Sequence, residues 1–342
     1  MSAVKRVFWN SAERRLRAVW RLIVQIIFLG LGLGCFGFFV GIIGVMQGLA
    51  GNMVSGETPD VAAVTDAMQQ PLVLGLSSII TLLAALFSVW LAGRFVDRRP
   101  FADFGLHLDL AWWRDLAFGM ALGALLMAGV FAVEWALGWV EITGTLVVQR
   151  TGFTFLGAIL LQVVTYLCVG IYEELFSRGY QLQNMAEGLR GILGKREGVI
   201  VAWLLSSSVF GLLHAANPNA SLFSTINLMI AGLFLGLGYL LTRELAIPIG
   251  LHITWNFFQG NVFGFPVSGG ASAVSLIGIE QGGPNLWTGG AFGPEAGLIG
   301  LAAIALGSLL IVLWIRWQHG DASLKHEIAE YEPQIEPAEE TA

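Results

Sequence analysis

Long apolar segments follow one another along the chain and leave little room for a soluble fold. Eight segments of about 20 residues run approximately over 22–46, 72–93, 115–138, 153–176, 198–214, 221–241, 247–263 and 297–316. A helix needs about 20 apolar residues to cross the hydrocarbon core of a bilayer. The 342 residues are 56% hydrophobic and only 12% charged, which excludes an ordinary soluble protein. We therefore predict an all-α, polytopic transmembrane bundle of about eight spans. The expected surroundings are a lipid bilayer, and no nucleic acid is expected as a partner.

Basic and non-basic connections alternate between these segments. Lysine and arginine occur in the connections near 94–99 and 177–197, whereas 52–70 and 264–296 contain neither. Arg150 is the exception. Cytoplasmic loops of membrane proteins carry the excess of lysine and arginine, so the pattern predicts that both termini are cytoplasmic. The short loops and the lack of an organelle signal favour a bacterial-type plasma (inner) membrane.

A single membrane domain is expected between two polar ends. Residues 1–21 carry six basic side chains and apolar residues at helical spacing, which predicts a basic amphipathic helix lying on the membrane. The bundle is expected over 22–317, with a long glycine-rich, irregular external loop at 264–296. Residues 318–342 contain six glutamates and two prolines and are predicted to form an acidic, disordered cytoplasmic tail.

Ionisable side chains occur at the end of the fourth apolar segment, at Glu173, Glu174 and Arg178. A charge at the centre of a membrane helix costs roughly 2.5 to 3.5 kcal/mol, so its presence indicates a function. Glu174 and Arg178 are four residues apart on one helix face and are predicted to form an ion pair. Glu173 points about 100° away from that face and is left free for chemistry. The alternative is a helix end from which Arg178 extends to the interface.

Two further polar motifs follow in later apolar segments. Phe210 precedes His214 by four residues in the fifth segment, and His252 precedes Asn256 by four in the seventh. Either histidine alone is as readily explained by a hydrogen bond between helices. Together, a carboxylate, two imidazoles and an amide can activate a water molecule and stabilise an oxyanion. A simple topology places His214 deeper than Glu173, so their convergence requires a tilted fifth span or an interfacial helix within 180–197.

The set of motifs resembles the CAAX prenyl endopeptidase and bacteriocin-processing family (CPBP) of intramembrane proteases, which includes the type II CAAX endopeptidases. The family motifs Glu-Glu-x-x-x-Arg, Phe-x-x-x-His and His-x-x-x-Asn fit, in that order, Glu173, Glu174 and Arg178, then Phe210 and His214, then His252 and Asn256. Each motif is short, but their order in successive hydrophobic segments is specific. The resemblance covers approximately residues 153–263.

This resemblance implies a glutamate protease without a cofactor. Glu173 and His214 would activate the water, His252 and Asn256 would hold the oxyanion, and Glu174 would orient the site. The substrate would be a peptide or membrane protein, lipidated or not. An alternative for the family makes Glu173, His214 and His252 ligands of a catalytic zinc ion, but no His-Glu-x-x-His spacing supports it. The rival class is a non-enzymatic membrane protein, such as a bacteriocin immunity factor, a scaffold or a small transporter.

Overall fold

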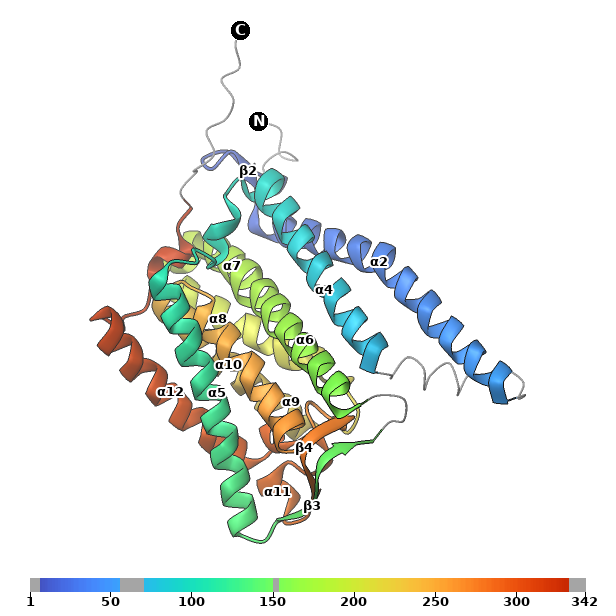
Figure 1. The fold of residues 1–342 in the computed structure, drawn as a ribbon. Coiled ribbons are helices and arrows are strands. Elements are labelled where there is room, and N and C mark those ends of the chain that lie inside the picture. The colour runs from blue at the N-terminus through green and yellow to red at the C-terminus, as the bar shows by residue number, and fades with distance from the viewer. Residues whose placement is uncertain (1–6, 56–70, 150–153, 332–342) are drawn as a thin grey trace.

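The computed structural model describes residues 7–55, 71–149 and 154–331, and the protein is a helical bundle there (Figure 1). Seven of the described helices are long and apolar enough to cross a membrane, so the chain is a multi-pass membrane protein. The helices are α2 (Ala18–Ser55), α4 (Pro71–Leu91), α5 (Leu110–Ala136), α6 (Phe155–Glu174), α7 (Gln183–Leu193), α8 (Lys195–Leu213), α9 (Leu222–Thr242), α10 (Ala246–Phe257), α11 (Asn285–Thr288) and α12 (Leu298–His319). The predicted polytopic bundle is confirmed.

The seventh apolar segment forms a short internal helix instead of a full span. Helix α10 has 12 residues, continues into the π-helical turn η4 (Phe258–Val262), and is buried among α5, α6 and α9. Close contact with α5 depends on glycine, because a Cβ atom added at Gly123 would lie 2.6 Å from the carbonyl oxygen of Leu251. Small residues let membrane helices approach each other in this way. A helix covered by protein on all sides does not need the length of a membrane span.

Helices α6, α7 and α8 form a long hairpin that explains the depth of His214. Helix α6 continues through the π-helical turn η3 (Leu175–Leu182) into α7, and the chain reverses at Gly194, where φ is 92°. About 20 residues, or roughly 30 Å of helix, separate Glu173 from this turn. Helix α8 returns by a similar length, so His214 lies near the level of Glu173. Helix α7 lies within residues 180–197, the segment in which an interfacial helix is one of the two predicted explanations for the depth of His214.

The first and last described segments of the chain meet at one end of the bundle. The β1–β2 hairpin (Trp9–Asn10, Arg15–Leu16) and the short turn η7 (His326–Ala329) lie at this end, which we call the basic end (Figure 1). The predicted amphipathic helix over 1–21 is therefore wrong for residues 9–17, while residues 1–6 lie outside the described residues. Arg15 is fully buried, because it pairs with carboxylates inside the protein.

The segment after α12 also differs from the prediction. Ile328 and Ala329 are fully buried against α7 and α8, so the segment from 318 to 331 is ordered. The apolar pair Ile328 and Ala329 supplies the buried contact that a purely acidic tail would lack. Residues 332–342 lie outside the described residues.

A two-stranded antiparallel ribbon closes the opposite end, which we call the loop end (Figure 1). Strand β3 (Val140–Val148) pairs with β4 (Val274–Gln281), with an irregularity between Ile142 and Gly144. The external loop predicted at 264–296 thus contains a strand and α11 and is not wholly irregular. Both strands are rich in β-branched residues, and their pairing satisfies backbone groups that a loop would leave to water.

Candidate active site

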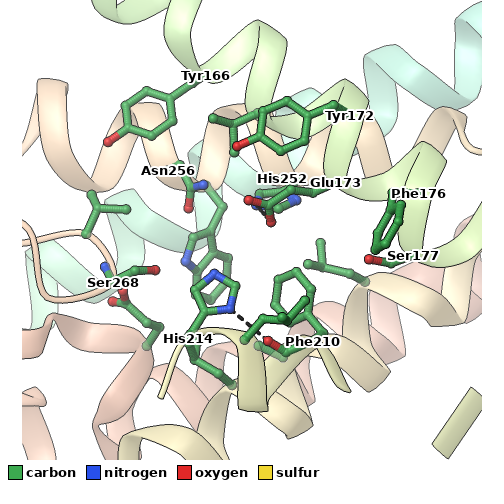
Figure 2. A pocket seen from close by; sticks show the side chains of 18 of the residues that line it. Tyr166, Tyr172, Glu173, Phe176, Ser177, Phe210, His214, His252, Asn256 and Ser268 are labelled. Atoms are coloured by element: carbon green, nitrogen blue, oxygen red, sulfur yellow. Dashed lines mark hydrogen bonds and ion pairs between the residues drawn. The ribbon is translucent and has the colours of Figure 1, made fainter. Parts of the chain in front are cut away.

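The three polar motifs meet in one cavity of ≈ 540 Å³ inside the bundle. Glu173 reaches it from α6, Phe210 and His214 from the end of α8, and His252 and Asn256 from α10. Figure 2 shows these side chains pointing toward a common space. The convergence on which the sequence interpretation depended is therefore present. Apolar residues of α2, α4 and α9 complete the wall.

Glu174 and Arg178 form the predicted ion pair inside the protein. Nη1 of Arg178 donates a hydrogen bond to Oε1 of Glu174 at 2.9 Å, and both side chains are at most 1% exposed. Nη2 of Arg178 donates to the carbonyl oxygen of Gly232 on α9, also at 2.9 Å. The arginine does not extend to the membrane interface. It ties the end of α6 to α9.

Glu174 also sets the orientation of His252. Nδ1 of His252 lies 2.8 Å from Oε1 of Glu174, the oxygen that already accepts from Arg178. A carboxylate paired with arginine acts as an acceptor, so we assign the proton of this contact to Nδ1 of His252. Nε2 is then directed to the cavity, 3.8 Å from Oε2 of Glu173. The two adjacent glutamates thus contact opposite sides of one imidazole.

His214 presents its second ring nitrogen to the cavity. Its Nδ1 lies 2.8 Å from the carbonyl oxygen of Phe210, which can only accept a hydrogen bond (Figure 2). Nδ1 therefore carries the proton in the neutral ring. Nε2 retains its lone pair and is available as a base.

Phe210 packs the charged and imidazole groups against one ring. Its centroid lies 4.8 Å from that of His214 and 6.2 Å from that of His252, and Cζ of Arg178 lies 4.7 Å above it. A cation over an aromatic face is attracted by the ring quadrupole. The phenyl ring therefore fixes the spacing between the two histidines and the arginine.

Glu173, His214 and Asn256 are the accessible members of the set. The side chain of Glu173 is 22% exposed, whereas that of Glu174 is fully buried, so the cavity reaches only the first carboxylate. Asn256 is half-buried and directs its amide into the same space (Figure 2). This difference in exposure agrees with the predicted division between a paired and a free glutamate.

The zinc alternative lacks a fitting set of ligands in the described part of the chain. No group of three or more histidine, cysteine, aspartate or glutamate side chains there is arranged to hold a metal ion. Glu173, His214 and His252 line the same cavity without forming such a group. Zinc sites need three or four ligands at about 2.0 to 2.3 Å from the metal.

The cavity has a second polar region that sequence reasoning missed. Glu295 lines it and is 4% exposed. Its carboxylate accepts from the backbone N–H of Ser268 at 2.6 Å and from the side-chain amide of Gln259. Burial raises the pKa of Glu295 to about 7. An acid among glycines gives no periodic signal, so only the folded structure distinguishes it from a solvated loop residue.

Comparisons with known proteins point to the same segment. Residues 155–258 match the family model described as type II CAAX prenyl endopeptidase Rce1-like. The chain is also similar to the "Uncharacterized protein YyaK" of Bacillus subtilis (strain 168), with 30% identity over 195 residues, which are 56% of this chain and 62% of that relative's length. No solved structure matches the chain significantly. The matched segment runs from α6 to η4 and contains all seven motif residues. Residues 155–258 of this chain are therefore a domain of the Rce1-like, type II CAAX prenyl endopeptidase family.

Proposed function

We propose that the chain is an intramembrane endopeptidase that hydrolyses a peptide bond with an activated water molecule. The observation that carries the proposal is the meeting of Glu173, His214, His252 and Asn256 in one cavity of the Rce1-like domain. These are the groups that a general base and an oxyanion site require. Apolar walls exclude bulk water, so each polar group in the cavity acts in a low dielectric.

In the proposed reaction, a water molecule lies between Glu173 and Nε2 of His214. Glu173 takes a proton as the water oxygen attacks the carbonyl carbon of the substrate, and the lone pair on His214 orients the water. The proton then passes to the nitrogen of the leaving amine as the C–N bond breaks. Carboxylate and imidazole bases in this role contribute about 10² to 10⁴ in rate.

His252 and Asn256 stabilise the tetrahedral intermediate in this proposal. Its oxyanion accepts hydrogen bonds from Nε2–H of His252 and from the amide of Asn256. The contact between Glu174 and Nδ1 of His252 holds the ring in place and stabilises its doubly protonated form. Preorganised donors of this kind are worth about 3 to 4 kcal/mol each.

The substrate in this proposal is a peptide or membrane protein whose cleaved segment reaches the cavity. Leu29 and Leu33 of α2 line the cavity, so an apolar or lipidated segment is accommodated beside the reacting bond. The basic end would face the cytoplasm of a plasma membrane, in keeping with the positive-inside rule. Processing of a bacteriocin and cleavage of a prenylated chain are both compatible with this site.

Peptide cleavage by the purified chain tests the proposal. A peptide library incubated with the protein in liposomes is analysed by mass spectrometry, for the native chain and for Glu173→Gln and His214→Ala. Glu280→Gln, an exposed glutamate on β4, is the matched control. Each protein is assayed with and without a metal chelator.

The outcomes separate the candidate functions. Loss of cleavage by about 10²-fold or more in both site variants, with the control active and the chelator without effect, supports the glutamate mechanism. Cleavage that the chelator abolishes would favour the zinc-dependent variant. Cleavage products that are equally abundant with all variants, or absent with every protein, would favour the non-enzymatic function.

A further inference from the structure

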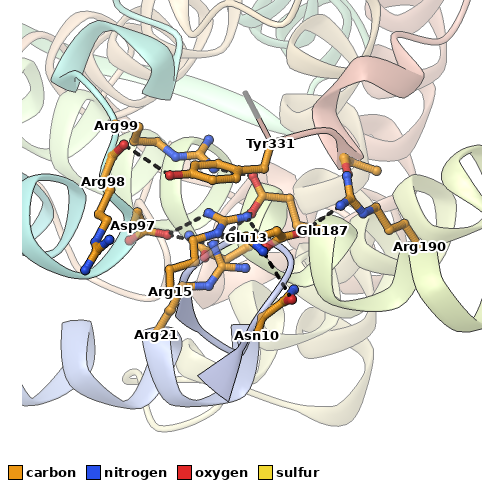
Figure 3. Close-up of polar contacts among 12 residues, drawn as sticks. Asn10, Glu13, Arg15, Arg21, Asp97, Arg98, Arg99, Glu187, Arg190 and Tyr331 are labelled. Atoms are coloured by element: carbon orange, nitrogen blue, oxygen red, sulfur yellow. Dashed lines mark hydrogen bonds and ion pairs between the residues drawn. The ribbon is translucent and has the colours of Figure 1, made fainter. Parts of the chain in front are cut away.

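A second group of buried charges lies at the basic end, outside the candidate active site (Figure 3). We call Arg15, Arg21, Asp97, Arg99 and Glu187 the arginine cluster, and each is at most 5% exposed. Oε2 of Glu187 lies 2.7 Å from Nη2 of Arg15 and 2.7 Å from Nη1 of Arg21. Its other oxygen pairs with Arg99. Arg21 also pairs with Asp97 at 2.9 Å. The cluster joins the N-terminal hairpin, α2, η1 (Ala92–Asp97) and α7.

Positive charge exceeds negative charge in this region. The arginine cluster holds three guanidinium groups and two carboxylates. Glu13 and Arg190 border it, pair with each other at 2.6 Å, and add one charge of each sign. Within the described residues, Nη1 of Arg15 and the Nε atoms of Arg21 and Arg99 are buried and have no hydrogen-bond partner. Each guanidinium group of the cluster is ion-paired, but a buried N–H donor without an acceptor is costly, so the one surplus positive charge favours the approach of a further anion.

A cavity of ≈ 520 Å³ adjoins the cluster between the start of α2 and α7. Three arginines line it, namely Arg17, Arg21 and Arg190, together with the glutamates Glu13 and Glu187, so the lining carries one more positive than negative charge. Apolar side chains form the rest of the wall, including Val19, Leu22, Leu189, Ile192 and Leu205. Ile192 is 82% exposed, so the apolar wall is open to the surroundings of the bundle.

We propose that this cavity binds a phosphate anion, presented by the head group of an acidic phospholipid. Arg17, Arg21 and Arg190 surround the phosphate, and the acyl chains follow the apolar wall beside Ile192. Guanidinium groups match phosphate oxygens in charge and fork geometry. Basic pockets between membrane helices at the cytoplasmic surface bind anionic head groups. The apolar wall favours the lipid over free phosphate, because free phosphate would leave that wall unused.

The experiment uses the full chain and measures lipid selection directly. The protein is reconstituted in nanodiscs of phosphatidylcholine with and without phosphatidylglycerol, and retained lipid is counted by native mass spectrometry. A separate arm adds inorganic phosphate to the protein in detergent and records the thermal unfolding midpoint, with phosphatidylglycerol in the same detergent for comparison. The variants are Arg17→Gln and Arg190→Gln, and the matched control is Arg196→Gln, an exposed arginine of α8 that does not line the cavity.

We expect phosphatidylglycerol to be retained in preference to phosphatidylcholine. Each site variant lowers this preference about five-fold, and the control leaves it unchanged. Arg17 is exposed and lies outside the arginine cluster, so its substitution keeps the cluster's ion pairs even if Arg190→Gln loosens the fold.

Two results would overturn the proposal. Equal retention of the two lipids excludes an anion site, and an equal loss in Arg196→Gln reduces the effect to general surface attraction. A midpoint raised as much by inorganic phosphate as by phosphatidylglycerol supports the anion site with free phosphate as its source. The readouts are independent of proteolysis, so the result stands whether or not the proposed peptidase function holds.

Discussion

The candidate active site and the arginine cluster both bury carboxylates beside arginine, but they use them differently. In the cavity, Glu174 is fully buried and paired, while Glu173 remains 22% exposed. In the arginine cluster, Glu187 is held by three arginines and lies outside that cavity. A buried carboxylate that is fully paired contributes to structure, whereas one left accessible beside imidazoles is available for proton transfer. The number of ion-pair partners and the access from the cavity therefore distinguish the carboxylates of the two regions.

The same substitution to glutamine at Glu173 and at Glu187 should give opposite phenotypes, loss of activity at the first and loss of stability at the second. Glu173→Gln is expected to lower peptide cleavage by about 10² to 10⁴ while the thermal unfolding midpoint in detergent stays the same, because the side chain is 22% exposed and its contact with His252 is long, at 3.8 Å. Cleavage and midpoint are measured on one preparation. A fall in the midpoint as large as that of a core variant would remove Glu173 from the catalytic role.

Glu187→Gln is expected to destabilise the fold by about 3 to 5 kcal/mol, because it leaves Arg15, Arg21 and Arg99 without their shared anion. Thermal unfolding in detergent measures the loss. Glu197→Gln, at an exposed glutamate in the first turn of α8, is the control and should cost less than about 1 kcal/mol. Similar losses in the two variants would show that the arginine cluster is not a structural centre.

Glu295 allows a test by pH at the loop-end side of the cavity. Its pKa in the folded protein is raised from 4.5 to about 7, and it faces Gln259, the N–H of Ser268 and Tyr166. The protonated form is favoured by folding, so this contribution is complete below pH 4.5 and is lost as pH rises through 7. The total is about 3 kcal/mol, from 1.36 kcal/mol per pKa unit.

Thermal midpoints at pH 5 and pH 8 measure this contribution in the native chain and in Glu295→Gln. The native chain should lose more stability than the variant between the two pH values, because glutamine does not titrate. Identical pH profiles would show that Glu295 titrates normally.

The contact between α5 and α10 offers the smallest of these effects. Gly123→Ala should destabilise the protein by about 1 to 3 kcal/mol, since its Cβ would press on the backbone of α10. Gly129→Ala on the same helix is the control, because no atom lies within 4 Å of the added Cβ. Greater stability is expected there, as alanine is the better helix former. Equal effects of the two substitutions would show that the close approach of α5 and α10 at Gly123 does not contribute to stability.

The sequence predicted the features that depend on local periodicity. Apolar length predicted the bundle, and spacing of four residues predicted the contact between Glu174 and Arg178. The motif residues also identified the helices that meet in the cavity. Whether Glu173, His214, His252 and Asn256 carry out catalysis stays a prediction until the variants are assayed.

The errors arose where distant segments decide local structure. The basic N-terminal segment has the pattern of an amphipathic helix, but Arg15 pairs with Glu187, 172 residues away, and the chain forms a hairpin there. Likewise, the partner strand of β3 is β4, which lies more than a hundred residues later in the sequence. Local spacing carries no information on either contact.

The sequence by itself determined a membrane bundle and the order of its polar motifs, because hydropathy and helical spacing act over a few turns. Tertiary structure decided which carboxylates are paired and which are accessible. It also decided that α10 is internal and that Glu295 faces the cavity. These properties depend on the packing of helices far apart in the chain, since desolvation and ion pairing are set by whatever surrounds a group in space.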